Sequence, residues 1–110
     1  MKLLFVCSEN RLRSPTAEAV FSQYEGVQTR SAGLGPFAET PVSGPLIEWA
    51  DVVVAMEKDQ KEAIQGEFGD ALGDRPLISL DIPDQYAYMQ PELVRLLEKR
   101  VPELVQLPAQ

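Results

Sequence analysis

One ten-residue stretch constrains this chain more than any other: Val6-Cys7-Ser8-Glu9-Asn10-Arg11-Leu12-Arg13-Ser14-Pro15. It follows the continuous apolar run Leu3–Val6, which is typical of a buried strand, and precedes Thr16–Phe21, which is typical of a helix. The only cysteine therefore falls on a predicted strand-to-helix turn, and Arg13 stands where the helix opens. Such a turn directs backbone N–H groups inward, and the helix N-terminus adds partial positive charge. The stretch predicts an anion site.

Cys7 and Arg13 have complementary chemistry in such a site. Positive potential favours the thiolate, which is the nucleophilic form of cysteine. The Arg13 guanidinium and the N–H groups from Ser8 to Arg13 would bind a tetrahedral oxyanion. Arginine is otherwise unfavourable at a helix N-terminus, and a lone cysteine is otherwise often a small buried apolar residue. Together they favour a phosphate site at which Cys7 forms a phosphocysteine intermediate.

These motifs resemble those of the low-molecular-weight protein tyrosine phosphatases. Cys7, five intervening residues and Arg13-Ser14-Pro15 resemble the signature loop of that family. Ser31-Ala32-Gly33 is similar to the tripeptide after its second strand, and Asp51 to Met56-Glu57 is similar to its third strand and exit. The chain is shorter than typical members and resembles a compact bacterial branch of predicted phosphatases.

The resemblance implies a role for each residue of the loop. Cys7 is the nucleophile and Arg13 the clamp, while the Ser14 hydroxyl bonds the thiolate and the Asn10 side chain braces the loop. Ser14 and Asn10 also have purely structural interpretations. Ser14 fits the N-cap position of the helix, and Asn10 tolerates a left-handed backbone conformation. The residues expected to bind substrate are Ser8, Glu9, Asn10, Arg11, Leu12 and Ser14.

The general acid is less determined by the sequence. Protonating the leaving group requires an acid, and without histidine a carboxylic acid is the natural candidate. The family's acid is an aspartate directly before a proline, after the fourth strand. Here Asp81-Ile82-Pro83-Asp84 holds no such pair. We favour Asp81, which follows the predicted strand, with Asp84 as the alternative; both also fit solvated turn residues.

Two further features bear on the predicted pocket. Tyr86 and Tyr88 resemble the aromatic pair that lines the family's pocket, although they fit packing of the last helix equally well. Glu9 replaces the family's usual glycine, so its carboxylate either repels substrate or points outward to pair with Arg11. Leu12 replaces a second loop cysteine, so no neighbouring thiol can form a disulfide with Cys7.

Strands and helices alternate along the chain. Strands are expected at 2–7, 27–31, 51–56 and 76–80, and helices from Pro15 to about Tyr24 and at 41–50, 58–68 and 92–105. This order predicts a parallel α/β sheet with ligands beyond the carboxyl ends of its strands. With the resemblance, the expected fold is a three-layer, phosphatase I-like domain over residues 1–110, with strand order 2-1-3-4 and helices on both faces.

Composition excludes several functional classes. The net charge of −7 argues against nucleic-acid binding, and the apolar runs are too short for membrane insertion. The absence of histidine excludes Ser-His-Asp and Cys-His catalysis, and the single cysteine excludes an intrachain disulfide and multi-cysteine zinc sites. The N-terminal apolar run is too short for a signal peptide. We expect a cytoplasmic protein.

The leading hypothesis is a metal-independent phosphomonoesterase of the protein tyrosine phosphatase type. It needs no cofactor, takes a phosphorylated protein or a small phosphoester as its partner, and releases phosphate. One alternative is a phosphocarrier similar to the IIB subunits of sugar phosphotransferase systems, which needs neither a clamp arginine nor an acid. Another is a non-catalytic phosphate-binding module, which Glu9 and the missing Asp-Pro pair favour.

Overall fold

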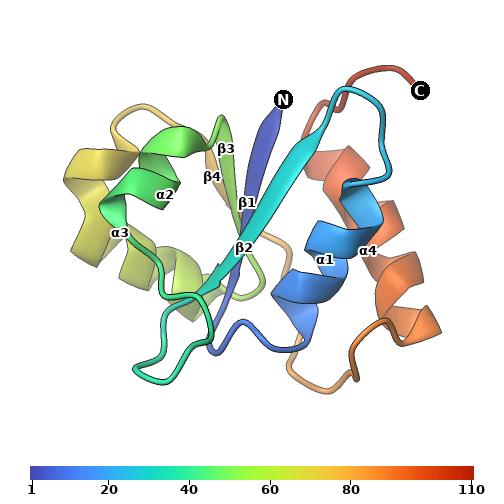
Figure 1. The fold of residues 1–110 in the computed structure, drawn as a ribbon, viewed down its shortest axis with the longest axis horizontal. Coiled ribbons are helices and arrows are strands. Elements are labelled where there is room, and N and C mark those ends of the chain that lie inside the picture. Colours follow the sequence, from blue (N-terminus) through green and yellow to red (C-terminus); the bar gives the residue numbers. More distant parts are fainter.

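Four parallel strands form the centre of the computed structural model, which describes residues 1–110. Their order is β2-β1-β3-β4, as predicted (Figure 1). The strands are β1 (Lys2–Cys7), β2 (Gln28–Gly33), β3 (Val52–Ala55) and β4 (Leu77–Ser79). β1 and β3 lie in the middle of the sheet and consist almost wholly of buried apolar residues, as expected for strands covered on both faces.

Helices cover both faces of this sheet, so the predicted three-layer arrangement is confirmed (Figure 1). α1 and α4 pack on one face, and α2 and α3 on the other. The sheet therefore separates two apolar cores, one around Phe5 and Phe21 and one around Leu4 and Ile64. The helices are α1 (Arg13–Phe21), α2 (Gly44–Trp49), α3 (Lys58–Leu72) and α4 (Pro91–Leu104).

Several element boundaries differ from those predicted, and three of the differences have a clear physical cause. β2 continues through Gly33, because it pairs with β1 as far as the Cys7–Gly33 register. α2 begins only at Gly44, where the Ser43 side chain accepts a hydrogen bond from the Leu46 N–H. α3 continues through Leu72 past a kink at Phe68, although glycine at 69 predicted a turn. Leu72 is buried, so packing outweighs the low helix propensity of glycine.

All four strands end at the same edge of the sheet. β1 ends at Cys7, β2 at Gly33, β3 at Ala55 and β4 at Ser79. The loops that follow β1 and β2 and the segment after β4 meet at this edge, at the bottom of Figure 1. None of the helices combines the length and apolar character needed to cross a membrane.

Candidate active site

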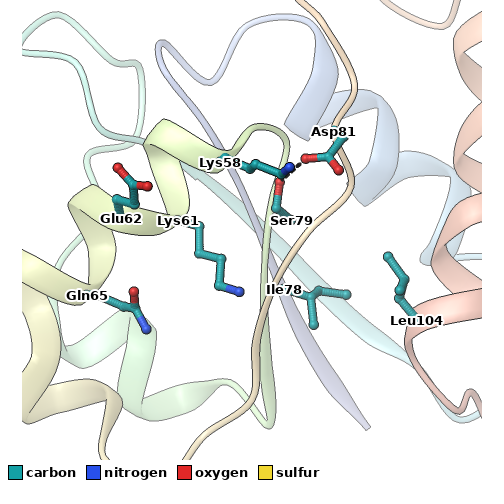
Figure 2. A pocket seen from close by; sticks show the side chains of 8 residues that line it. All are labelled: Lys58, Lys61, Glu62, Gln65, Ile78, Ser79, Asp81 and Leu104. Carbon is teal, nitrogen blue, oxygen red and sulfur yellow. Dashed lines mark hydrogen bonds between the residues drawn. The ribbon is translucent and has the colours of Figure 1, made fainter.

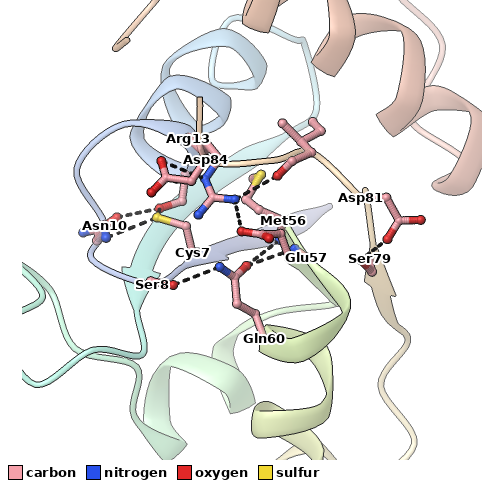
Figure 3. Close-up of polar contacts among 12 residues, drawn as sticks. Cys7, Ser8, Asn10, Arg13, Met56, Glu57, Gln60, Ser79, Asp81 and Asp84 are labelled. Atoms are coloured by element: carbon pink, nitrogen blue, oxygen red, sulfur yellow. Dashed lines mark hydrogen bonds and ion pairs between the residues drawn. The ribbon is translucent and has the colours of Figure 1, made fainter. Parts of the chain in front are cut away.

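Cys7 lies at the base of the loop that joins β1 to α1, and it is buried. The Asn10 backbone N–H donates to its Sγ at 3.2 Å, and the Ser14 Oγ lies 2.9 Å from the same sulfur (Figure 3). Hydrogen bonds to a charged group are stronger than neutral ones, so this pair of contacts stabilises negative charge on the sulfur. The thiol therefore has the surroundings of a nucleophile.

Ser14 is not the N-cap that the sequence predicted. α1 begins two residues earlier than predicted, at Arg13, and Leu12 occupies the cap position without a side-chain hydrogen bond. The Ser14 hydroxyl instead contacts Cys7 and donates to Asn10 Oδ1 at 2.9 Å. A hydroxyl has one proton, so donation to a Cys7 thiolate requires it to turn away from Asn10.

Asn10 has both a left-handed backbone conformation and a side chain that hydrogen-bonds within the loop. Its φ of 57° lies in the left-handed region, which asparagine adopts more readily than most residues. Its side chain accepts the Ser14 hydrogen bond, and the residue is buried. Backbone conformation and side chain together shape the loop around the sulfur.

The segment after β2 forms a wall against this loop. Leu34 N–H donates to the Cys7 carbonyl at 3.0 Å, and Glu39 N–H donates to the Glu9 carbonyl at 3.3 Å. Gly33 lies so close that a Cβ built on it would be 2.9 Å from the Asn10 nitrogen and 2.7 Å from the Ala38 Cβ. The glycine of the Ser-Ala-Gly tripeptide is therefore required by close packing against the loop.

Arg13 is almost completely buried, with 3% of its surface exposed. Its Nη1 donates to the Ile82 carbonyl at 2.8 Å and forms a hydrogen-bonded ion pair with Glu57 (Figure 3). Its Nε lies 3.7 Å from the Asp84 carboxylate. A buried guanidinium is thus held by two segments that are distant from it in the sequence, the start of α3 and the segment after β4.

The structure separates the two candidate acids. Asp84 approaches Arg13 and lines a hollow of about 300 Å³, together with Cys7, Ser8, Glu9, Arg11, Leu12 and Arg13. Asp81 has a φ of 56°, and its carboxylate accepts from the Ser79 hydroxyl at 2.9 Å. It lines a different hollow beside β4, with Lys58 and Lys61 (Figure 2). The Asp81 side chain faces away from Cys7 in this structure (Figure 3).

The remaining predicted residues are placed around the rim. Glu9 pairs with Arg11 through a 3.7 Å contact between exposed side chains, which is the outward orientation considered for it. Tyr86 is half-buried and packs against the core of the α1/α4 face, whereas Tyr88 is exposed. Neither tyrosine lines the Cys7 hollow. Of the two interpretations considered for these tyrosines, the position of Tyr86 corresponds to packing against the last helix.

Two residues at the β3–α3 junction contact the loop and were missed as site residues. Glu57 pairs with Arg13, and Gln60 Nε2 donates to the Ser8 hydroxyl at 3.1 Å. A signal was present in the sequence, because Glu57 directly follows a strand that ends at the same edge as Cys7. Gln60 stands three residues later, where it closes a capping interaction with the Glu57 N–H at 3.0 Å.

No family model matches the chain, but comparison with known proteins finds relatives in sequence and in fold. A protein-arginine-phosphatase of Bacillus subtilis (strain 168) is 30% identical in sequence, and the match covers 63% of this chain and 64% of that protein. A structure of YwlE arginine phosphatase with a phosphorylated active-site serine is 28% identical, with a TM-score of 0.68 over 98% of this chain and 100% of the other. The tyrosine phosphatase Wzb from Escherichia coli K30, in complex with phosphate, has a TM-score of 0.76 at 21% identity, covering 93% and 88% of the two chains.

The chain is similar in fold to low-molecular-weight protein tyrosine phosphatases and in sequence to the arginine phosphatases. The likeness to Wzb concerns the fold, whereas the two arginine phosphatases also match in sequence. The loop from Cys7 to Ser14 is the segment for which the sequence predicts an anion site. We call this segment, residues 7–14, the phosphate loop.

Proposed function

We propose that this protein is a metal-independent phosphomonoesterase that acts through a phosphocysteine intermediate on Cys7. The observation that carries the proposal is the contact set of the Cys7 sulfur, which receives the Asn10 N–H and touches the Ser14 hydroxyl inside the phosphate loop. The similarity to the arginine phosphatases and the buried Arg13 beside the same loop support it. The phosphocarrier alternative gives no reason for that arginine.

The reaction proceeds in two displacements. The N–H groups of the phosphate loop and the free edge of the Arg13 guanidinium hold the three phosphoryl oxygens. The Cys7 thiolate attacks phosphorus in line; the bond from phosphorus to the leaving group breaks, and that group takes a proton from the acid. The same carboxylate then removes a proton from water, which attacks phosphorus, breaks the S–P bond and releases phosphate.

We assign the acid to Asp84 in place of Asp81. Asp84 shares a hollow with Cys7 and lies 3.7 Å from Arg13 Nε, so it stands where the leaving group would depart. Its side chain is 64% exposed, which leaves it in contact with the water that the second step consumes. Asp81 is tied to Ser79 and would have to leave its left-handed backbone conformation to reach the thiol.

A phosphorylated protein side chain is the substrate we favour. The sequence pointed to phosphotyrosine, which leaves as a phenol. The relatives named as arginine phosphatases favour phosphoarginine as a second candidate, in which the leaving atom is a guanidinium nitrogen. Both leaving groups require a proton from the same acid, so Asp84 serves either substrate. Peptides carrying each modification, compared at equal concentration, would decide between them by kcat/KM.

Hydrolysis of a generic aryl phosphate tests the activity directly. Wild type should turn over equally with and without a chelator, and Cys7→Ser should be inactive. Asp84→Asn should lose about a hundredfold or more in kcat, while Asp81→Asn should retain wild-type turnover. A large loss in Asp81→Asn alone would reverse the assignment of the acid. Absence of wild-type turnover on aryl phosphate and on both peptides, with phosphate still bound, would favour a binding module.

A further inference from the structure

The β3–α3 junction contacts the phosphate loop at both of its ends. Glu57 pairs with Arg13 at the end that enters α1, and Gln60 donates to Ser8 at the end that leaves β1 (Figure 3). No other segment of the chain forms side-chain hydrogen bonds to both ends of the loop. The junction is therefore placed to control the width and orientation of the loop.

Gln60 forms the rigid part of this junction. It is 3% exposed, and its Oε1 accepts from the Met56 N–H at 3.1 Å and from the Glu57 N–H at 3.0 Å. Its amide is thereby fixed, with Nε2 directed at Ser8. The N–H groups of Glu57 and of the residue before it are thus both anchored, so the starting point of the Glu57 side chain is fixed relative to β3.

Glu57 determines which edge of the Arg13 guanidinium is free. Both protons of Nη1 have acceptors, one in the Glu57 carboxylate and one in the Ile82 carbonyl. A guanidinium has five N–H donors, so Nε and Nη2 retain three, along the edge suited to bidentate binding of an oxyanion. Without Glu57, one Nη1 proton of a buried cation loses its partner, and the guanidinium can turn to find another.

Glu57 also places a negative charge beside the clamp. Arg13 is buried and Glu57 is about one third exposed, so their interaction is only partly screened by solvent. The carboxylate lowers the positive potential that the phosphate loop offers to a dianion. It therefore orients Arg13 and at the same time weakens the hold on phosphate, which is the product.

We propose that Glu57 is a positioning residue of the phosphatase reaction, acting through Arg13. The proposal rests on the proposed function for its effect on turnover. Its effect on phosphate binding is independent of that function. The carboxylate orients the guanidinium by accepting a hydrogen bond, and its charge speeds release of phosphate by lowering affinity.

Two substitutions separate these contributions. Glu57→Gln keeps an acceptor oxygen at the same position and removes the charge, whereas Glu57→Ala removes both. Glu67→Gln, at an exposed position further along α3, controls for the change in net charge. For each purified protein we would measure kcat and KM on an aryl phosphate, the affinity for inorganic phosphate by calorimetry, and the folded fraction by thermal unfolding.

The expected pattern distinguishes positioning from a purely structural role. Per folded molecule, Glu57→Ala should lose about tenfold or more in kcat, as expected for a misplaced clamp. Glu57→Gln should stay within about threefold of wild-type kcat and bind inorganic phosphate about three- to tenfold more tightly. Glu57→Ala should bind phosphate more weakly than Glu57→Gln, because those two variants differ only in the acceptor. Glu67→Gln should match wild type.

Several results would overturn the proposal. Equal kcat in wild type and Glu57→Ala would show that Arg13 keeps its orientation unaided. A Glu57→Gln variant as slow as Glu57→Ala would show that the acceptor oxygen does not orient the clamp. If wild type itself lacks turnover, the proposed function fails, and phosphate affinity decides the positioning proposal alone. Equal affinities of the Gln and Ala variants would then refute it.

Discussion

Replacing Gly33 with alanine would move the Asn10 N–H that donates to the Cys7 sulfur. The new Cβ would lie 2.9 Å from the Asn10 nitrogen and 2.7 Å from the Ala38 Cβ, whereas ordinary contacts begin at 3.4 Å. The phosphate loop and β2 must therefore separate by about 0.5 Å. Both segments are held by backbone hydrogen bonds, so the shift cannot be absorbed by rotating one side chain.

The magnitude follows from this displacement. A misplacement of about 1 Å costs on the order of a hundredfold in rate, so about half of it should cost roughly tenfold in kcat/KM. Overpacking of this kind should also lower the free energy of unfolding by about 1–3 kcal/mol. Turnover of an aryl phosphate and denaturant unfolding would measure the two effects in the same preparation.

Gly66→Ala is the matched control. A Cβ at Gly66 meets nothing within 4 Å, and the residue lies inside α3. The substitution should leave kcat/KM unchanged and raise the free energy of unfolding by about 0.5–1 kcal/mol. If Gly33→Ala loses stability but keeps wild-type kcat/KM, the clash is relieved away from the sulfur and the coupling inferred from the structure is wrong.

Three other substitutions test single contacts. Ser14→Ala removes the hydroxyl at the sulfur and should lower kcat about ten- to a hundredfold; unchanged kcat would exclude a role at the thiolate. Asn10→Gly and Asn10→Ala both remove the side chain that accepts from Ser14, but only glycine adopts the left-handed backbone without strain. In denaturant unfolding Asn10→Gly should therefore be about 1 kcal/mol more stable than Asn10→Ala. Equal stabilities would contradict backbone strain at this position. Glu92, at the start of α4, has its pKa lowered chiefly by a hydrogen bond from its own backbone N–H and then by Gln90. The stabilising effect of the Glu92 carboxylate is present above its ordinary pKa and is lost as pH falls through the lowered pKa. The melting temperatures of wild type and Glu92→Gln should therefore converge in acid. A constant difference in melting temperature across the pH range would contradict this.

The sequence predicted the parts of the site that are local. Cys7, Asn10, Arg13 and Ser14 lie within one turn and one helix start, where spacing alone fixes their proximity. The parallel sheet and the common edge were also predicted correctly, because the alternation of strands and helices admits few topologies, and the resemblance supplied the strand order. The misassigned N-cap at Ser14 has a physical cause: its hydroxyl has partners in the phosphate loop that compete with the helix N-terminus.

The parts that the sequence did not supply depend on tertiary contacts. Whether Asp81 or Asp84 faces Cys7 is decided by a left-handed residue after β4 and by Arg100, which donates to the carbonyls of Leu80 and Asp81 at 2.7 Å. The role of Glu57 depends on its contact with Arg13, which is 44 residues away in the sequence. Neither contact leaves a periodic or short-range pattern that could be read from the chain.

The anchoring of Arg13 has a consequence for the order of folding. Its bonds to Glu57 and to the Ile82 carbonyl span 44 and 69 residues, and the bond between Ser8 and Gln60 spans 52. During synthesis, the residues of the phosphate loop are made first, but their anchors follow only after most of the chain. Long-range contacts form late because closing large loops is entropically costly. A nascent chain that ends before Ile82 therefore has every residue of the phosphate loop but lacks an acceptor that holds Arg13 in place.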